Sequence, residues 1–303
     1  MRPSHPCPTL LAAALAITLA APASSATTVL GDDPYPSTYQ RIEAPDTLIR
    51  NATVLVGDGT RIDGADVLLR DGRIARVGRG LDAPRDAVVV DASGRWVTPG
   101  LIDVHSHLGV YPVPGLEAHQ DGNEMTNPVT AQVWAEHGVW PQDPGFNTAL
   151  AGGVTSMLIL PGSANLIGGR GVVLKNVPGE TYQQMKFPGA PWSLKMACGE
   201  NPKRVYGSRG SAPMTRMGNV AGYRNAFIEA RAYLDKLDSE EPPTQDLRLE
   251  SLAAAMNGEI KVQIHCYRAD EMAIMLDLAE EFDFEVAAFH HATEAYKIAD
   301  KLA

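Results

Sequence analysis

Two histidines one residue apart occur in the sequence GLIDVHSHLG, which spans residues 100–109. In an extended strand alternate side chains point to the same face, so Asp103, His105 and His107 are expected to lie together. Two imidazoles that converge at the end of one strand are a typical arrangement of metal ligands. Two histidines packed or solvated near a turn are the competing interpretation, and other parts of the chain must decide between them.

Three later apolar stretches carry further candidate ligands near their carboxyl ends, and they are PWSLKMA (191–197), KVQIHCY (261–267) and EVAAFHH (285–291). Alternation places Lys195, His265 and His291 opposite apolar residues that would face a layer of helices, and it turns His290 outward beneath such a helix. Functional residues of parallel βα barrels gather at the carboxyl ends of several strands. The agreement of these segments with the first one therefore favours a metal centre over packed histidines.

The elements that must position these side chains are expected to be strands alternating with helices, which is typical of parallel βα units. Before them, short alternating apolar runs from Thr47 to about Val97 indicate a small antiparallel β unit, with a two-residue hairpin turn at Asp71-Gly72. Beyond Gly100 the expected strands are 101–107, 154–160, 191–197, 261–267 and 285–291, with a weaker one at 171–176, and the expected helices are 221–237, 247–256 and 269–282.

The run GRWVTPGLIDVHSHLG, placed after a small β unit, resembles the amidohydrolase superfamily of metal-dependent hydrolases. The segments SLKMACGENPKRVYG, KVQIHCYRADEM and FHHATEAYKIADKLA resemble the fourth, fifth and sixth barrel strands of that superfamily with their following turns. The imidazolonepropionase-like amidohydrolases and related dipeptidases are the most similar branches. The resemblance runs from about Thr47 to the C-terminus. It implies an α/β fold, a (β/α)8 TIM-type barrel of which about six strands are present, with a small N-terminal β-sandwich unit.

The resemblance also implies a set of site residues. His105 and His107 match the ligands of the more buried metal ion, and His265 and His291 match those of a second ion. Lys195 matches a lysine that many members carboxylate to a metal-bridging carbamate, so Lys195 and His291 are the expected catalytic residues. One or two divalent ions are implied, zinc in the first place, and a metal-bound hydroxide would attack the carbonyl of a C–N substrate.

Two nearby residues offer alternatives. Glu200 could supply the bridging carboxylate in place of Lys195, but a separation of five residues cannot put both on one face of a strand, and alternation favours Lys195. Arg204 could bind a substrate carboxylate, with solvated surface charge as the competing interpretation. The loop LPGSANLIGGRG (160–171) could present backbone N–H groups to a substrate oxygen, or be a plain flexible loop.

The N-terminus has the composition of a signal peptide over residues 1–26: Arg2, the apolar run LLAAALAITLAA, and small residues up to Ala26. A periplasmic or secreted protein is therefore expected. No later run is long enough for a membrane span, and the net charge of −10 argues against nucleic acid as a partner.

In an oxidising compartment Cys198 and Cys266 could form one disulfide, although buried unpaired cysteines are the favoured interpretation.

The expected organisation is a signal peptide (1–26), an irregular lead-in (27–46), a small β-sandwich part (47–99) and a partial hydrolase barrel (100–303). Members of the superfamily have eight barrel strands and an aspartate after the eighth, whereas this chain ends at Ala303 after the sixth. A C-terminally truncated chain is therefore expected.

The predicted function is that of an exported metal-dependent amidohydrolase that cleaves amide, dipeptide or cyclic amide substrates. The alternatives are a deaminase of the same superfamily, with Glu271 as a loosely placed candidate residue, and a truncated remnant that binds metal or ligand without turnover. The oligomeric state is left open.

Overall fold

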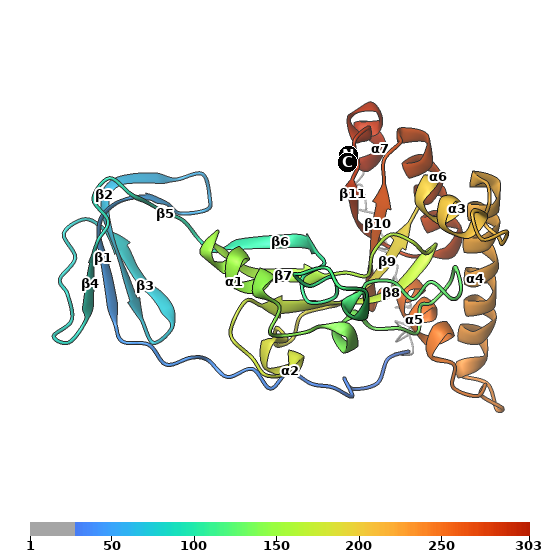
Figure 1. The fold of residues 1–303 in the computed structure, drawn as a ribbon, viewed down its shortest axis with the longest axis horizontal. Coiled ribbons are helices and arrows are strands. Elements are labelled where there is room, and N and C mark those ends of the chain that lie inside the picture. Colours follow the sequence, from blue (N-terminus) through green and yellow to red (C-terminus); the bar gives the residue numbers. More distant parts are fainter. Residues whose placement is uncertain (1–27) are drawn as a thin grey trace, which may run out of the picture.

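The structure, a computed structural model, describes residues 28–303. The expected signal peptide lies outside these residues, so export remains a prediction. The chain forms a small sheet at one end and a larger six-stranded sheet covered by helices at the other (Figure 1). Residues 28–46 contain no helix or strand and run along one side of the large unit toward the small sheet (Figure 1). Within residues 28–303, no helix combines the length and apolarity needed to cross a bilayer.

The small sheet has the strand order β3-β2-β1-β4, with β5 also paired to β1. The hairpin expected at Asp71-Gly72 joins β2 to β3, and both residues have positive φ, 52° and 66°, as this tight turn requires. The expectation of a purely antiparallel unit is wrong, because β4 and β5 run parallel to β1. The chain leaves the edge strand β3 and crosses to the other side of β1, and a crossover of this kind yields parallel pairing. The strands are β1 Thr47–Leu55, β2 Arg61–Arg70, β3 Arg73–Gly78, β4 Val88–Asp91 and β5 Trp96–Val97.

The larger sheet is barrel-like, with the order β11-β10-β9-β8-β7-β6. Five strands are mutually parallel, as expected, but β8 is antiparallel to both of its neighbours. Only a short connection without a helix joins β7 to β8, and such a connection returns the chain in the opposite direction. The weakly expected strand at 171–176 is thus real, longer and reversed. The strands are β6 Leu101–Ser106, β7 Val154–Ile159, β8 Ile167–Lys175, β9 Trp192–Ala197, β10 Ile260–Cys266 and β11 Val286–His291.

Three helices cover the outer face of β9 and β10: α4 Arg216–Leu237, α5 Leu247–Met256 and α6 Ala269–Phe282. The apolar residues predicted to face outward on these strands are buried in this core, so Lys195 and His265 are left on the inner face. The remaining helices are η1 Glu117–His119, η2 Ala135–Gly138, α1 Pro144–Ala151, α2 Tyr182–Met185, α3 Glu200–Gly207, η3 Ala295–Ile298 and α7 Ala299–Leu302.

The edge strand β6 departs from the expected pattern. Alternation predicts that Ile102 and Val104 face a helix layer, but their side chains are 69% and 62% exposed. The opposite face of β6 is the one that carries the two histidines. The inward placement of His105 and His107 therefore does not depend on a covering helix behind them.

Candidate metal centre

The β6 histidines are held with two ring nitrogens facing each other. The Nε2 atoms of His105 and His107 lie 3.2 Å apart, and the rings cross at 85°. His107 Nδ1 is 2.8 Å from the backbone oxygen of Leu160. Since that oxygen can only accept a hydrogen bond, Nδ1 carries the proton and Nε2 keeps its lone pair. An imidazole whose second nitrogen donates to a backbone carbonyl is the usual form of a metal-ligating histidine.

The geometry of this pair suits one shared cation. Two nitrogens at tetrahedral positions around zinc, each at 2.0–2.1 Å, are about 3.3 Å apart. The observed Nε2 separation of 3.2 Å is close to that value. In addition, Nδ1 of His265 on β10 is buried without a hydrogen-bond partner. Buried polar atoms without partners are rare, and a bound ion is one explanation for them.

Lys195 extends from β9 into the interior and is fully buried, with 0% of its surface exposed. Its Nζ donates a hydrogen bond to the backbone oxygen of Pro161 at 3.0 Å. Burial lowers the pKa of Lys195 to about 7, because an enclosed ammonium group loses its hydration. At neutral pH a large fraction of this amine is therefore unprotonated, which a surface lysine is not. An unprotonated amine is the form that can react with carbon dioxide.

The histidines on β10 and β11 complete the cluster. His265 pairs in register with His290, so these two side chains share the inner face of the sheet. The ring of His290 lies 4.4 Å from that of His105, and its Nε2 donates to the side-chain oxygen of Gln263 at 2.9 Å. The expectation that His290 packs outward beneath a helix is therefore wrong.

His291 reaches the same cluster through an unusual backbone. Its φ is +66° and that of Ala292 is +41°, so the strand stops being extended at this point. The ring of His291 lies 4.6 Å from that of His265 and 5.0 Å from that of His105. Two adjacent residues of one strand normally point to opposite faces, and the left-handed turn at His291 removes that constraint.

The electrostatics of the cluster keep the imidazoles neutral. Burial, together with the charges of Lys195 and the neighbouring rings, lowers the pKa of His105 and His265 to about 3 and that of His290 to about 4. Burial also lowers the pKa values of His107 and His291. Neutral imidazoles with free lone pairs are what a metal ion requires.

The alternative residues lie elsewhere. Glu200 is the first residue of α3, with 52% of its side chain exposed and a carboxylate oxygen 3.9 Å from Arg216. Geometry therefore favours the enclosed Lys195 over Glu200 at the bridging position. Arg204 is exposed on the same helix, so its predicted role in substrate binding has no geometric support.

Two backbone N–H groups of the glycine-rich loop after β7 are hydrogen-bonded to another part of the chain. The amide of Gly162 donates to the oxygen of Gly122, and that of Ala164 donates to the side-chain oxygen of Asn123. These two N–H groups are thus not available to a substrate oxygen. These hydrogen bonds instead attach the loop to the segment that carries Tyr111. The ring of Tyr111 lies 5.6 Å from that of His107.

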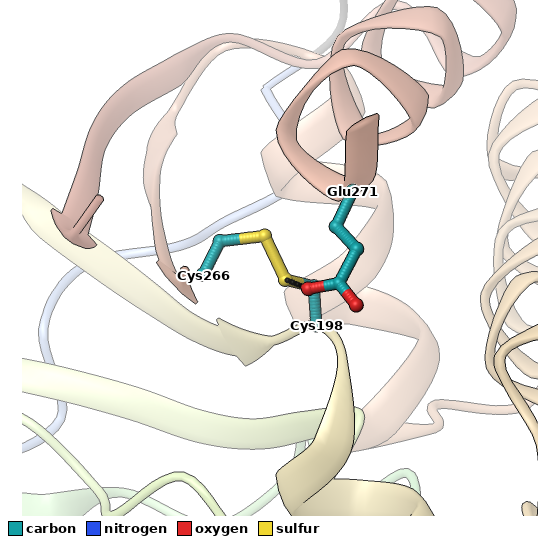
Figure 2. A group of neighbouring side chains, drawn as sticks. All are labelled: Cys198, Cys266 and Glu271. Atoms are coloured by element: carbon teal, nitrogen blue, oxygen red, sulfur yellow. Dashed lines mark hydrogen bonds between the residues drawn. A yellow bond between two sulfur atoms is a disulfide. The ribbon is translucent and has the colours of Figure 1, made fainter. Parts of the chain in front are cut away.

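Cys198 and Cys266 form a disulfide with a Cα–Cα distance of 5.2 Å. The favoured expectation of two unpaired cysteines is therefore wrong. In residues 28–303, the one set of three His, Cys, Asp or Glu ligand atoms within 4.8 Å of one another consists of these cysteines and Glu271 (Figure 2). Because the sulfurs are bonded to each other, this set is not a thiolate metal site. Glu271 is ion-paired with Arg216.

Sequence reasoning missed three residues that contact the cluster: Asn201, Tyr267 and Tyr111. The Nδ2 atom of Asn201 lies 3.2 Å from His265 Nε2, and the ring of Tyr267 lies 4.6 Å from that of His265. Tyr267 follows β10 by one residue, so its closeness to a candidate ligand was a usable signal. Asn201 lies on a different element from the histidine it contacts, and no spacing in the sequence indicates that contact.

Comparison with known proteins identifies the family. No protein-family model matches the chain. The crystal structure of an amidohydrolase from Thermotoga maritima MSB8 has 40% sequence identity and a TM-score of 0.78, over 85% of this chain and 67% of that one. The amidohydrolase tasK of Hapsidospora irregularis is 38% identical over 295 residues, which is 84% of this chain and 30% of the relative. A 5-methylthioadenosine/S-adenosylhomocysteine deaminase of Pyrococcus furiosus is 35% identical over 96 residues, 32% of this chain and 20% of the relative.

These similarities and the six-stranded α/β sheet agree with the predicted TIM-type fold. The chain belongs to the amidohydrolase superfamily. It spans less than a third of the length of these two curated relatives.

Proposed function

We propose that this chain forms the metal-binding part of a hydrolase that cleaves C–N bonds in small amide, dipeptide or cyclic amide molecules. The observation that carries the proposal is that His105 and His107, Lys195, and His265 and His291 come together from four strands and their ends. Lys195 and His265 are buried there, and His291 is exposed at the margin. One or two divalent cations would be held there, with zinc the first candidate because neutral imidazoles are the main donors. Such cations supply Lewis acidity, which lowers the pKa of water and polarises carbonyl groups.

The side chains of the cluster have different roles in binding the cations. His105 and His107 hold two nitrogens at the spacing one cation needs, while His291 beside His105, and His265 beside His291, offer further imidazole donors. The neutral Lys195 amine would add to carbon dioxide, forming an N–C bond and releasing one proton, and the resulting carbamate, whose negative charge is shared by two oxygens, would offer both oxygens as ligands. Burial of the site excludes bulk water from the carbamate and strengthens its interaction with cations.

The deaminase alternative has less geometric support. It would employ an acidic residue near the fifth strand, and Glu271 is the candidate in the sequence. This carboxylate is instead buried beside the disulfide (Figure 2), and it is paired with Arg216. We therefore favour hydrolysis of amides, and release of ammonia from a ring-amino compound that contains no amide would favour the deaminase.

Export to the periplasm or cell exterior is part of the proposal. It is supported by the signal-like composition of residues 1–26 and by the Cys198–Cys266 disulfide, because disulfides persist in oxidising compartments. Cell fractionation with an antibody to the chain tests it, and a cytoplasmic pool retaining residues 1–26 would contradict it.

The activity is tested by loading the protein with zinc, measuring bound metal by mass spectrometry, and assaying a panel of amides, dipeptides and cyclic amides. We expect bound zinc and hydrolysis. His105→Ala should lose hydrolysis and the ion held by the His105–His107 pair, and the control His119→Ala, which changes a histidine outside the cluster, should keep both. Carbon-13 NMR after exposure to labelled bicarbonate should show a carbamate that is absent from Lys195→Ala. Bound zinc with no hydrolysis of any substrate would instead support a binding protein without turnover.

A further inference from the structure

His265 has one nitrogen with a partner and one without. The imidazole is 2% exposed, its Nε2 lies 3.2 Å from Nδ2 of Asn201, and its Nδ1 is buried with no hydrogen-bond partner. Whether Nδ1 carries a proton therefore depends on the contact made by Nε2, because a neutral imidazole carries its proton on only one of its two nitrogens.

The structure places the Nδ2 end of the Asn201 amide toward Nε2, and a half-turn about the last side-chain bond would place the oxygen there instead. If its N–H group donates, Nε2 must keep the lone pair, and the proton is placed on Nδ1, where no acceptor exists. If its oxygen accepts, the proton stays on Nε2 and the lone pair of Nδ1 is free. Only the second arrangement makes Nδ1 a ligand for a cation, and it avoids a buried donor with no acceptor.

Two other histidines of the cluster are already held in this way. His107 donates from Nδ1 to the backbone oxygen of Leu160, and His290 donates from Nε2 to the side-chain oxygen of Gln263. In both, an oxygen acceptor retains the proton on one nitrogen, so the other nitrogen keeps its lone pair. We propose that Asn201 is a positioning residue that does the same for His265: its side-chain oxygen accepts from Nε2–H and keeps the Nδ1 lone pair directed into the candidate metal centre.

The local structure holds Asn201 in place for this role. Asn201 is the second residue of α3, which begins after Gly199, a glycine with φ of +73° that turns the chain sharply away from β9. The disulfide then ties Cys198 to Cys266, the residue directly after His265 (Figure 2). The covalent bridge thus connects the start of α3 to the end of β10, which keeps the amide at hydrogen-bond distance from the imidazole.

The proposal rests on the proposed function for its metal, but the protonated nitrogen is observable without one. In metal-free protein labelled with nitrogen-15 histidine, long-range NMR correlations report which ring nitrogen carries the proton, and His265→Gln identifies the signal. We expect the Nε2–H form in the unaltered chain and in Asn201→Asp, whose carboxylate can only accept. We expect a mixture of both forms in Asn201→Leu, which is similar in size and offers no acceptor.

Zinc affinity, measured by competition with a chromophoric chelator, gives the second readout. Asn201→Leu should weaken binding about 10–100-fold, the usual cost of losing a partner of a metal-ligating histidine. Asn201→Asp should retain it, as should the control Asn225→Leu, which makes the same change at an exposed position of α4.

Three results would overturn the proposal: an Nδ1–H form in the unaltered chain, an unchanged Nε2–H form in Asn201→Leu, or equal losses of zinc affinity in the Asp and Leu variants. Absence of zinc binding by the unaltered chain would refute the proposed metal centre, and the NMR result would still decide whether Asn201 sets the proton on His265.

Discussion

The two histidine pairs of the cluster, at the ends of β6 and of β11, are directed inward by different backbone geometry. His105 lies in β6 and His107 directly follows the strand, two residues further on, and the alternation of side chains brings them to one face. His290 and His291 are adjacent, and both reach the centre because φ turns positive at His291. The comparison teaches that alternation places side chains reliably only while the backbone remains extended, and that strand ends need separate attention.

The pairs also differ in their surroundings. Both β6 and β11 are edge strands of the sheet, but β6 pairs only with β7, whereas β11 pairs with β10, whose end is joined to the end of β9 by the disulfide. The β6 pair therefore depends on its own hydrogen bonds, and the β11 pair depends on the packing and covalent structure of its neighbours.

The largest expected effect is that of His107→Ala. The substitution removes one of the two nitrogens that face each other and releases the Leu160 oxygen, so zinc affinity at this position should fall by roughly 1,000-fold or more. Metal analysis after dialysis should show about one ion less per chain. The control His119→Ala should keep the unaltered metal content, and equal metal content in His107→Ala would exclude the β6 pair as ligands.

The second prediction concerns the covalent support of β10. Replacing both cysteines in Cys198→Ala/Cys266→Ala opens a loop with a sequence separation of 68 residues, which should cost about 4 kcal/mol of unfolding free energy. Urea denaturation measures the change. A reductant should destabilise the unaltered protein and leave the double variant unaffected, and equal stability of the two proteins would show that the bridge adds nothing.

The third prediction separates the two histidines of β11. Loss of His291 should remove a ligand, whereas loss of His290 should remove only a neighbour that is hydrogen-bonded to Gln263. We therefore expect His291→Ala to weaken zinc binding more than His290→Ala does, with a loss of about 10–100-fold at most for the latter. Isothermal titration with zinc measures both, and the opposite order would assign the ligand to His290.

The smallest expected effect concerns the backbone conformation at His291. A positive φ is unfavourable for any residue with a Cβ, so His291→Gly should be more stable than His291→Ala by about 1 kcal/mol. Because both variants lack the imidazole, their difference in urea denaturation reports the backbone alone. A more stable His291→Ala would contradict the left-handed conformation at this position.

Much of the fold follows from local pattern. The helices expected at 247–256 and 269–282 have those bounds as α5 and α6, because each begins and ends at a change in apolar spacing and packs one face on β9 and β10. The hairpin at Asp71-Gly72 is equally local, since a two-residue turn with positive φ demands such residues. The reversed direction of β8 and the parallel β4 were not predictable in the same way, because strand direction depends on where a connection leads in space.

The sequence by itself determined the composition of the candidate centre: His105 and His107 at a spacing of two, and Lys195 and His265 each opposite an apolar face. Those properties arise from the period of an extended strand, which needs no knowledge of distant residues. Only the tertiary structure decided that His290 faces inward, that Cys198 and Cys266 are bonded, and that Asn201 contacts His265. Each of these depends on the relative placement of elements distant in the chain or on a single φ angle, and no local repeat of residue types encodes either one.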